Sequence, residues 1–173
     1  SAWHKATDMF GPIPYKEAGK GLITVPYDSQ EEVYKSMFKE LSDAIEVLTK
    51  YADNGNSKLL PNADAIYAGD VHKWVVYANS LMLRLAMRVY YADAALSKQY
   101  ALQAVNHSYG VMKTKDDEAK MERGASLEFK NNLDVLINQY NECRMGSSML
   151  AYLGGYQDPR LPKYFNTSTV SQA

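Results

Sequence analysis

The chain has 173 residues, of which 46% are apolar and 23% charged, with 19 basic against 20 acidic side chains. This length allows one domain with a proper hydrophobic core, and the near-zero net charge argues against the broad basic field of a non-specific nucleic-acid-binding protein. A single cysteine excludes an internal disulfide framework and a four-cysteine zinc site. The aromatic residues are unusual, because 14 are Tyr and only 4 are Phe and 2 are Trp.

The start of the chain carries many turn signals. Pro12 and Pro14 block a helix and favour extended backbone in the residue before each of them. Gly19 and Gly21 continue the turn chemistry. Residues 1–28 are therefore predicted to be an irregular lead-in.

A regular helix is predicted over residues 30–52. Ser29 and Glu32 match the capping-box pattern, and apolar residues from Val33 to Leu48 recur at helical spacing and make one face. Opposite charges four residues apart on the solvent side add roughly a few tenths of a kcal/mol per pair. These pairs are Glu31–Lys35, Lys39–Asp43 and Glu46–Lys50.

A second helix is predicted over residues 70–92, with Asp70 as its N-cap. Apolar residues lie nearly all round it, which indicates a central, buried helix with Trp74 in the core. A shorter helix follows over residues 94–107, and the three make a helical scaffold, residues 29–107. The first two are expected to form one antiparallel pair of a tetratricopeptide-like stack, although the sequence has no exact internal repeat.

The rest of the chain, residues 108–173, reads as a loop-rich part with short helices. Residues 133–140 are ambiguous between helix and strand, and residues 147–153 are predicted to form a short helix with a serine cap. No long alternating strand pattern appears. The predicted fold class is mainly α, with tetratricopeptide-like helix pairs and long irregular loops, and residues 1–173 are expected to be a single domain.

No pattern of catalytic, metal-binding or cofactor-binding residues is present. His4, His72 and His107 stand alone, without a second ligand at metal spacing, and are expected to be ordinary surface or helix-end residues. Cys143 has no catalytic partner nearby, and the sequence lacks a Gly-rich phosphate loop and a nucleophile elbow. We therefore expect no catalytic residue, no metal and no cofactor, and a protein that is not an enzyme.

Arg84 and Arg88 lie four residues apart on the predicted buried helix. As a functional pair they would clamp an anion. As structural residues they would pack their stems and place their heads against carboxylates or the helix C-terminus. The structural interpretation is favoured.

The loop tyrosines and tryptophans are the candidate binding residues. The faces of Trp and Tyr stack on the apolar C–H faces of sugars, while nearby polar groups bond the hydroxyls. The alternative is that each ring is half-buried at the end of an element, where an amphipathic ring sits well. The nominated glycan-binding residues are Trp3, Tyr15, Tyr67 and Tyr156, chosen by loop position and ring chemistry alone.

Two stretches of the sequence are similar to the SusD/RagB family of outer-membrane lipoproteins of Bacteroidetes. The first is DAIYAGDVHKW at residues 64–74, continued by ANSLMLRLAMR at residues 78–88. The second is Tyr152 and Leu153 followed by QDPRLPKYF at residues 157–165. FGPIPY at residues 10–15 and YDSQEEVY at residues 27–34 occur in the expected order, so the resemblance covers nearly the whole chain.

The resemblance implies a surface-exposed, glycan-binding lipoprotein of a nutrient-uptake system. Such proteins cap a TonB-dependent, SusC-like transporter in the outer membrane and deliver oligosaccharides to it without cleaving a bond. Members are commonly longer and begin with a lipidated cysteine, so we expect this chain to be an internal portion whose lipid anchor lies outside it. The family motifs are scaffold motifs, and they do not carry over any glycan-contacting residue.

Two alternatives remain open from the sequence. The helix pairs also suit a protein–protein interaction scaffold with no sugar site of its own. A peptide or glycopeptide is also compatible with the resemblance as the ligand of an uptake protein. Specific binding of a glycan by the chain separates these hypotheses.

Overall fold

The structure is a computed structural model that describes residues 2–121 and 132–165. The chain divides into two compact units, residues 1–124 and 125–173.

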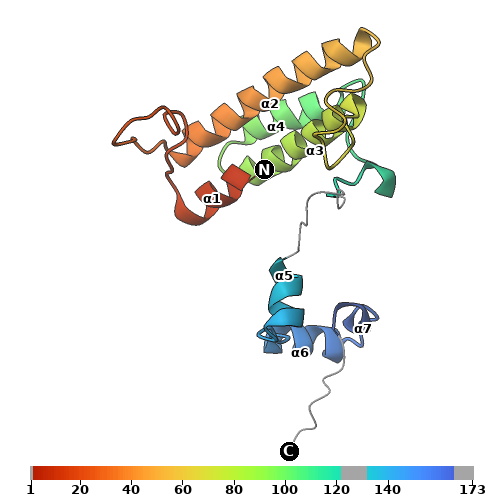
Figure 1. The fold of residues 1–173 in the computed structure, drawn as a ribbon. Helices are drawn as coiled ribbons and strands as arrows, with labels where there is room; N and C mark the ends of the chain where they lie inside the picture. The colour runs from red at the N-terminus through yellow and green to blue at the C-terminus, as the bar shows by residue number, and fades with distance from the viewer. Residues whose placement is uncertain (1, 122–131, 166–173) are drawn as a thin grey trace, which may run out of the picture. The chain divides into compact units, whose positions relative to one another are not determined.

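Three helices form the body of the first unit: α2 (Gln30–Asp53), α3 (Val71–Val89) and α4 (Ala94–Val105). Figure 1 shows them side by side, with α3 running back along α2 and α4 turning again beside α3. The Arg88 side chain near the end of α3 contacts Tyr34 near the start of α2, as an antiparallel pair requires. The predicted helices are confirmed, with ends shifted by at most a few residues.

Local chemistry sets where these helices begin. Ser29 and Glu32 form the predicted capping box on α2, and Asp70 caps α3 by accepting a hydrogen bond from the Lys73 backbone N–H at 3.0 Å. Asp93 caps α4 in the same way. All three predicted ion pairs along α2 are present.

The core of the first unit is built around α3, as the all-round apolar pattern predicts. Val75, Met82 and Ala86 of α3 are buried, together with residues of α2 and α4. The rings of Phe38 on α2 and Tyr100 on α4 stack with centroids 4.2 Å apart. The helices that flank α3 in the sequence therefore also contact each other.

Residues 2–10 correct the prediction of an irregular lead-in, because they form the helix α1 (Ala2–Phe10). The two prolines that argued against helix lie beyond its end, and only residues 11–28 are irregular. Thr7 is fully buried, and its hydroxyl donates a 2.6 Å hydrogen bond to the Gly11 carbonyl. Asp8 accepts a 2.8 Å hydrogen bond from the Tyr34 hydroxyl and forms an ion pair with Arg88. Tertiary contacts of this kind leave no periodic signal in the sequence.

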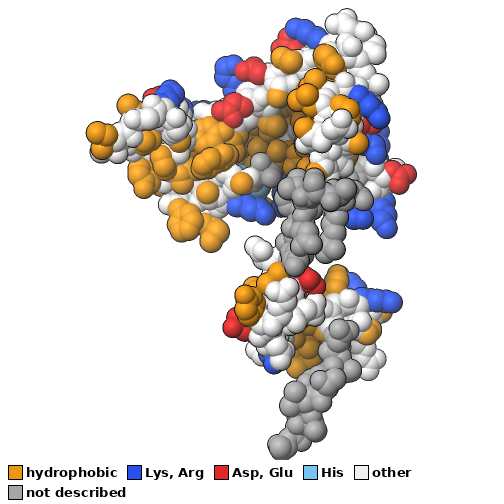
Figure 2. Space-filling model, in the orientation of Figure 1, with side chains coloured by type: hydrophobic (Ala, Val, Ile, Leu, Met, Phe, Trp, Pro, Cys, Tyr) orange, Lys and Arg blue, Asp and Glu red, His pale blue; other side chains and the backbone are white. Residues whose placement is uncertain are grey.

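Apolar side chains are exposed around α1 and the irregular segment that follows. Figure 2 shows hydrophobic side chains gathered over this N-terminal part of the first unit. Met9 and Phe10 are about three-quarters exposed, and Ile23 and Tyr27 are also exposed. This part of the surface is more apolar than the charged solvent side of α2.

One carboxylate organises the segment before α3. Asp64 accepts hydrogen bonds from the backbone N–H groups of Ile66, Tyr67 and Gly69 and a 2.7 Å bond from Nε1 of Trp74. Desolvation acts to raise the pKa of Asp64, but these hydrogen bonds together hold it below the usual value. Trp74 is consequently half-buried with its indole N–H turned to the loop, not enclosed in the core as the sequence predicts.

The second unit is described from residue 132. It contains α5 (Asn132–Asp134), the π-helix η2 (Val135–Gln139), α6 (Ser147–Gly155) and α7 (Leu161–Tyr164), so residues 133–139 of the ambiguous stretch are helical. The N-cap of α6 is Gly146 rather than the predicted serine, and no side chain caps it. Across the described residues there is no strand and no helix long and apolar enough to cross a membrane.

Substituting Gly69 by alanine is expected to destabilise the first unit strongly. Gly69 has φ +78°, and an added Cβ would lie 2.5 Å from the Leu59 carbonyl oxygen. An alanine is strained in this left-handed backbone conformation, and the close contact forces the backbone to shift. Together these effects predict a loss of roughly 2–4 kcal/mol in the free energy of unfolding. Gly55 is the matched control, because it has φ +85° but nothing within 4 Å of the added atom. Gly55→Ala should cost only about 1 kcal/mol, and equal losses in chemical denaturation would contradict the packing argument.

Candidate binding site

Two of the nominated aromatic residues, Trp3 and Tyr15, come together beside a cavity of about 190 Å³. Their ring centroids lie 5.8 Å apart with the planes at 87°, and Trp3 is 51% exposed. An indole that is half-covered by a neighbouring ring edge keeps a face available for a ligand. The remaining lining residues are His4, Met37, Glu40, Leu41, Leu81 and Leu85.

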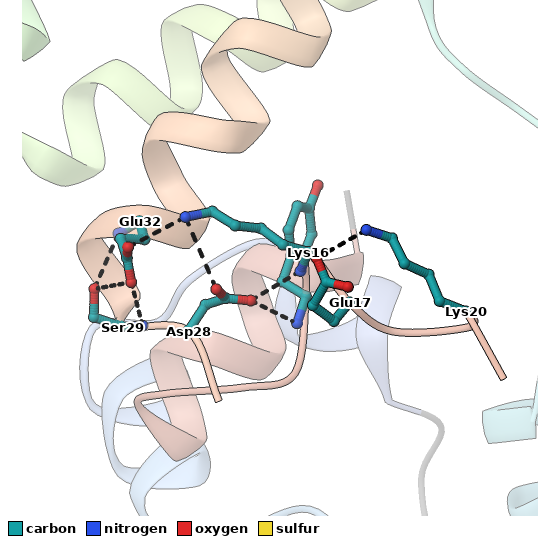
Figure 3. Close-up of polar contacts among 7 residues, drawn as sticks. Lys16, Glu17, Lys20, Asp28, Ser29 and Glu32 are labelled. Carbon is teal, nitrogen blue, oxygen red and sulfur yellow. Dashed lines mark hydrogen bonds and ion pairs between the residues drawn. The ribbon is translucent and has the colours of Figure 1, made fainter. Parts of the chain in front are cut away.

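Tyr15 is positioned by contacts of the irregular segment with the start of α2. The backbones of Ile13 and Asp28 exchange hydrogen bonds of 3.1 and 2.9 Å. The Asp28 carboxylate accepts from the backbone N–H groups of Tyr15 and Lys16, and Figure 3 shows the Lys16 ammonium between Asp28 and Glu32. The Lys16 and Tyr15 N–H groups hold the pKa of Asp28 below its usual value against desolvation. A charged Asp28 therefore fixes the backbone on which Tyr15 stands.

Glu40 gives the cavity a polar group. The Tyr15 hydroxyl donates a 2.6 Å hydrogen bond to Oε2 of Glu40, which lies on α2. Burial, followed by the hydrogen bond to Glu40, raises the pKa of Tyr15, so the phenol stays neutral. The sequence gives no sign of this partner, because the two residues are 25 positions apart. Aromatic faces beside one anchored carboxylate can hold a sugar ring and accept hydrogen bonds from its hydroxyls.

His4 lines the same cavity from the first turn of α1, a helix-end position as expected, but its side chain is buried rather than on the surface. It is 3% exposed, and its Nδ1 has no hydrogen-bond partner among the described residues. Burial lowers the pKa of His4; the nearby Arg88 and Arg84 lower it further, while Asp8 opposes them. His4 is therefore neutral in the folded protein around neutral pH.

Tyr67 does not join this site. It is 8% exposed, its hydroxyl donates a 2.9 Å hydrogen bond to the Asp117 carbonyl, and its ring meets Trp74 edge to face at 5.2 Å. Burial, with nearby negative groups, raises the pKa of Tyr67 to about 12. In this position the ring holds the loop before α3 and offers no open face to a sugar.

Tyr156 lies in the second unit and is paired with a ring that the sequence reasoning did not nominate. Tyr152 is four residues earlier on α6, so the two side chains share one side of the helix. They are 66% and 80% exposed, with centroids 6.3 Å apart and planes within 16° of parallel. The four-residue spacing is the signal that points to Tyr152.

No group of three or more His, Cys, Asp or Glu side chains that could hold a metal ion occurs within residues 2–121 and 132–165. Cys143 is partly buried and free.

Comparison with known proteins decides the family. The family model described as SusD-like, SusD and RagB outer membrane lipoprotein, matches residues 1–173. The chain belongs to the SusD/RagB family. No curated protein matches the sequence.

Solved structures of SusD homologues share the fold. A chitin-binding SusD homologue from Flavobacterium johnsoniae is 41% identical with a TM-score of 0.87, over 96% of this chain and 34% of its own. A SusD homologue from Bacteroides uniformis is 42% identical with a TM-score of 0.82, over 96% and 34%. A further chitin-binding protein is 34% identical with a TM-score of 0.71, over 93% and 33%. The chain thus spans about a third of the length of these SusD-like structures.

The stability of this SusD-family chain is expected to fall as the pH drops below about 6.5. Burial lowers the pKa of both His4 and His107, and His107 accepts a hydrogen bond at Nδ1 from the Tyr109 N–H that a protonated ring cannot accept. Near pH 6.5, the usual pKa of histidine, these two rings take up protons in the unfolded chain but not in the folded chain. The contribution of the two neutral rings to stability is therefore full above that pH and declines below it.

Denaturant midpoints at about pH 7.5 and about pH 5.5 measure this effect. A His4→Leu/His107→Gln double variant should show a clearly smaller difference between the two midpoints than the wild type. The exposed His72 serves as the control through His72→Gln. If the midpoint changes between the two pH values by the same amount in the double variant and the wild type, the pH dependence of stability does not come from these two rings.

Proposed function

We propose that this chain is part of a non-catalytic protein that captures glycans at the bacterial surface for uptake. The observation that carries the proposal is the Trp3–Tyr15 pair over the cavity that contains Glu40. The sequence similarity supports it, because a SusD homologue 41% identical to the chain binds chitin. Chitin-type oligosaccharides, chains of N-acetylglucosamine, are therefore the first ligands to test.

Capture in this proposal combines stacking with hydrogen bonds. The exposed face of Trp3 covers the C–H face of one sugar ring, and the free oxygen of Glu40 accepts from its hydroxyls. Leu81 and Leu85 provide an apolar floor that suits the methyl group of an N-acetyl substituent. Each contact is weak alone and reversible, which suits a protein that must release its ligand again.

The site supports retention of a glycan rather than its cleavage. Hydrolysis of a glycosidic bond uses two carboxyl groups roughly 5–10 Å apart across the bond. Glu40 is the one carboxylate among the lining residues of the Trp3–Tyr15 cavity, and its Oε2 is already occupied by the Tyr15 hydroxyl. The geometry thus favours a binding protein.

The cellular role follows from the family. Its model describes outer membrane lipoproteins. We propose that the full-length protein is lipid-anchored on the outer membrane, faces outward and passes oligosaccharides to a TonB-dependent, SusC-like transporter. A protein-docking scaffold is the competing function, and the exposed apolar side chains of the N-terminal part are the feature that favours it.

Trp3→Ala is expected to weaken binding of a chitin tetrasaccharide by about tenfold or more, because an aromatic anchor typically contributes 2 kcal/mol or more at a binding site. Tyr15→Phe keeps the ring and removes the bond to Glu40, so its loss should be smaller. Isothermal titration calorimetry measures both. Tyr91→Ala is the matched control, since that ring is 98% exposed and contacts Tyr90 alone among the described aromatic rings. Absence of glycan binding by the folded wild type would favour the docking scaffold.

A second contact is proposed at the parallel rings of Tyr152 and Tyr156. Tyr156→Ala is expected to reduce retention of the chain in affinity gels that contain soluble chitin derivatives, by several-fold, because one of two stacking faces is lost. Tyr140→Ala is the control, because Tyr140 is 63% exposed in the same unit and has no ring partner among the described residues. If the two variants migrate equally, Tyr156 does not contribute to glycan binding.

A further inference from the structure

A second cavity, of about 290 Å³, is lined by His4 together with other residues, mainly of α1 and α3. Tyr77, Ser80 and Arg84 follow one another at spacings of three and four along α3, so they share one helix face. Lys5 of α1 lies opposite them. The lining is completed by His4, Leu81 and Met112.

The charge of this cavity is uncompensated. Lys5 and Arg84 both line it, no Asp or Glu does, and neither cation has an ion-pair partner in the part of the chain that the structure describes. Arg88, one turn further along α3, differs because it pairs with Asp8. The sequence favours a structural role for both arginines, and the structure supplies the carboxylate for Arg88 only.

The remaining polar groups of the cavity are mostly unused donors. The Tyr77 hydroxyl makes no hydrogen bond with any described residue, whereas the Ser80 hydroxyl is occupied by the Val76 carbonyl and the Met112 N–H. His4 is buried with an unpartnered Nδ1. A concave surface with two cations, a free phenol and a buried unpartnered imidazole is suited to a negatively charged group, which forms charge-assisted hydrogen bonds with such donors.

The two cavities are neighbours. His4 and Leu81 line both the Trp3–Tyr15 cavity and the cationic one. A glycan residue stacked on Trp3 therefore has a substituent or an adjoining sugar within reach of the cations.

We propose that the cavity of Lys5, Tyr77 and Arg84 binds the carboxylate or sulfate group of an acidic glycan whose neighbouring sugar occupies the Trp3–Tyr15 cavity. This inference rests on the proposed glycan-binding function. It extends the proposed ligands from neutral chitin-type chains to chains that carry an acidic sugar beside a neutral one. The guanidinium of Arg84 binds the acid group in a forked, bidentate manner, and Lys5 adds a second charge.

Hyaluronan oligosaccharides test the proposal, because they alternate N-acetylglucosamine with a uronic acid. The matched ligand is the same oligosaccharide after reduction of its carboxyl groups, which differs only in charge. At low salt the wild type should bind the native form about tenfold more tightly than the reduced form. Arg84→Gln and Lys5→Gln should each reduce that preference by several-fold and leave the affinity for the reduced form unchanged. Arg84→Lys should retain part of it, and Lys98→Gln, an exposed lysine of α4, should retain all of it.

Each outcome has a defined meaning. Equal binding of native and reduced oligosaccharide by the wild type overturns the acidic-ligand inference and leaves the proposed glycan function standing. Absence of binding to either form and to the chitin tetrasaccharide, with the chain folded by circular dichroism, overturns both. If inorganic sulfate competes with native hyaluronan and removes the preference for it, the result supports an anion site that binds both free sulfate and the acid group of a glycan. Sulfate binding that depends on Arg84, without any preference between the two oligosaccharides, overturns the glycan part of the proposal.

Discussion

The burial of the apolar side chains of α3 between α2 and α4 is the constraint on which the first unit depends. An apolar residue such as Met82 or Leu85 contributes roughly 1.5–3 kcal/mol only if it is fully removed from water. One neighbouring helix cannot cover a helix that is apolar all round, so α2 and α4 must both pack on it and touch each other through Phe38 and Tyr100. Polar residues of α3 instead form hydrogen bonds with neighbouring segments of the chain. Asn79, 1% exposed, donates a 2.9 Å hydrogen bond to the Gly110 carbonyl and so fixes the segment after α4.

The same constraint explains how α1 is held. A helix of nine residues is not stable in water by itself, so α1 exists because its side chains find partners on the scaffold. Arg88 reaches past the apolar stripe of α3 to pair with Asp8, and the Tyr34 hydroxyl and the Gln30 amide donate to the same carboxylate. This network places Trp3, His4 and Lys5 where they close the two cavities. The proposed binding surface is thus a consequence of helix docking, and no single segment of sequence forms it.

The parts of the fold that were predictable from the sequence are those with local causes. The capping box of Ser29 and the ion pairs of α2 involve residues three or four apart, and periodicity located three helices. The helix α1 was missed because its stability comes from Arg88 and Tyr34, which are distant in the chain. Trp74 was placed in the core because the pattern around it is apolar, whereas its indole N–H is bound by Asp64, ten residues earlier in a loop.

The candidate site was predictable only in residue type. Loop position and ring chemistry selected Trp3 and Tyr15, but their meeting depends on Asp28, which binds the backbone of Tyr15 from the far end of an irregular segment. The same reasoning selected Tyr67, whose ring is packed because its hydroxyl meets the Asp117 carbonyl fifty residues away. Exposure is a property of the folded chain, so residue type and local position cannot distinguish a stacking ring from a packing ring.

The two cavities that His4 lines carry opposite electrostatic character, and this gives the proposed site a direction. Glu40 makes one cavity an acceptor of hydrogen bonds, while Lys5 and Arg84 make the other a donor. A ligand with hydroxyls at one end and an acid at the other fits in one orientation, because the reverse places an anion beside Glu40 and leaves both cations unpaired. Stacking on Trp3 does not depend on salt, whereas the contribution of the cations is screened within about 10 Å at 0.1 M ionic strength. The salt dependence of binding therefore separates the two contributions within a single ligand.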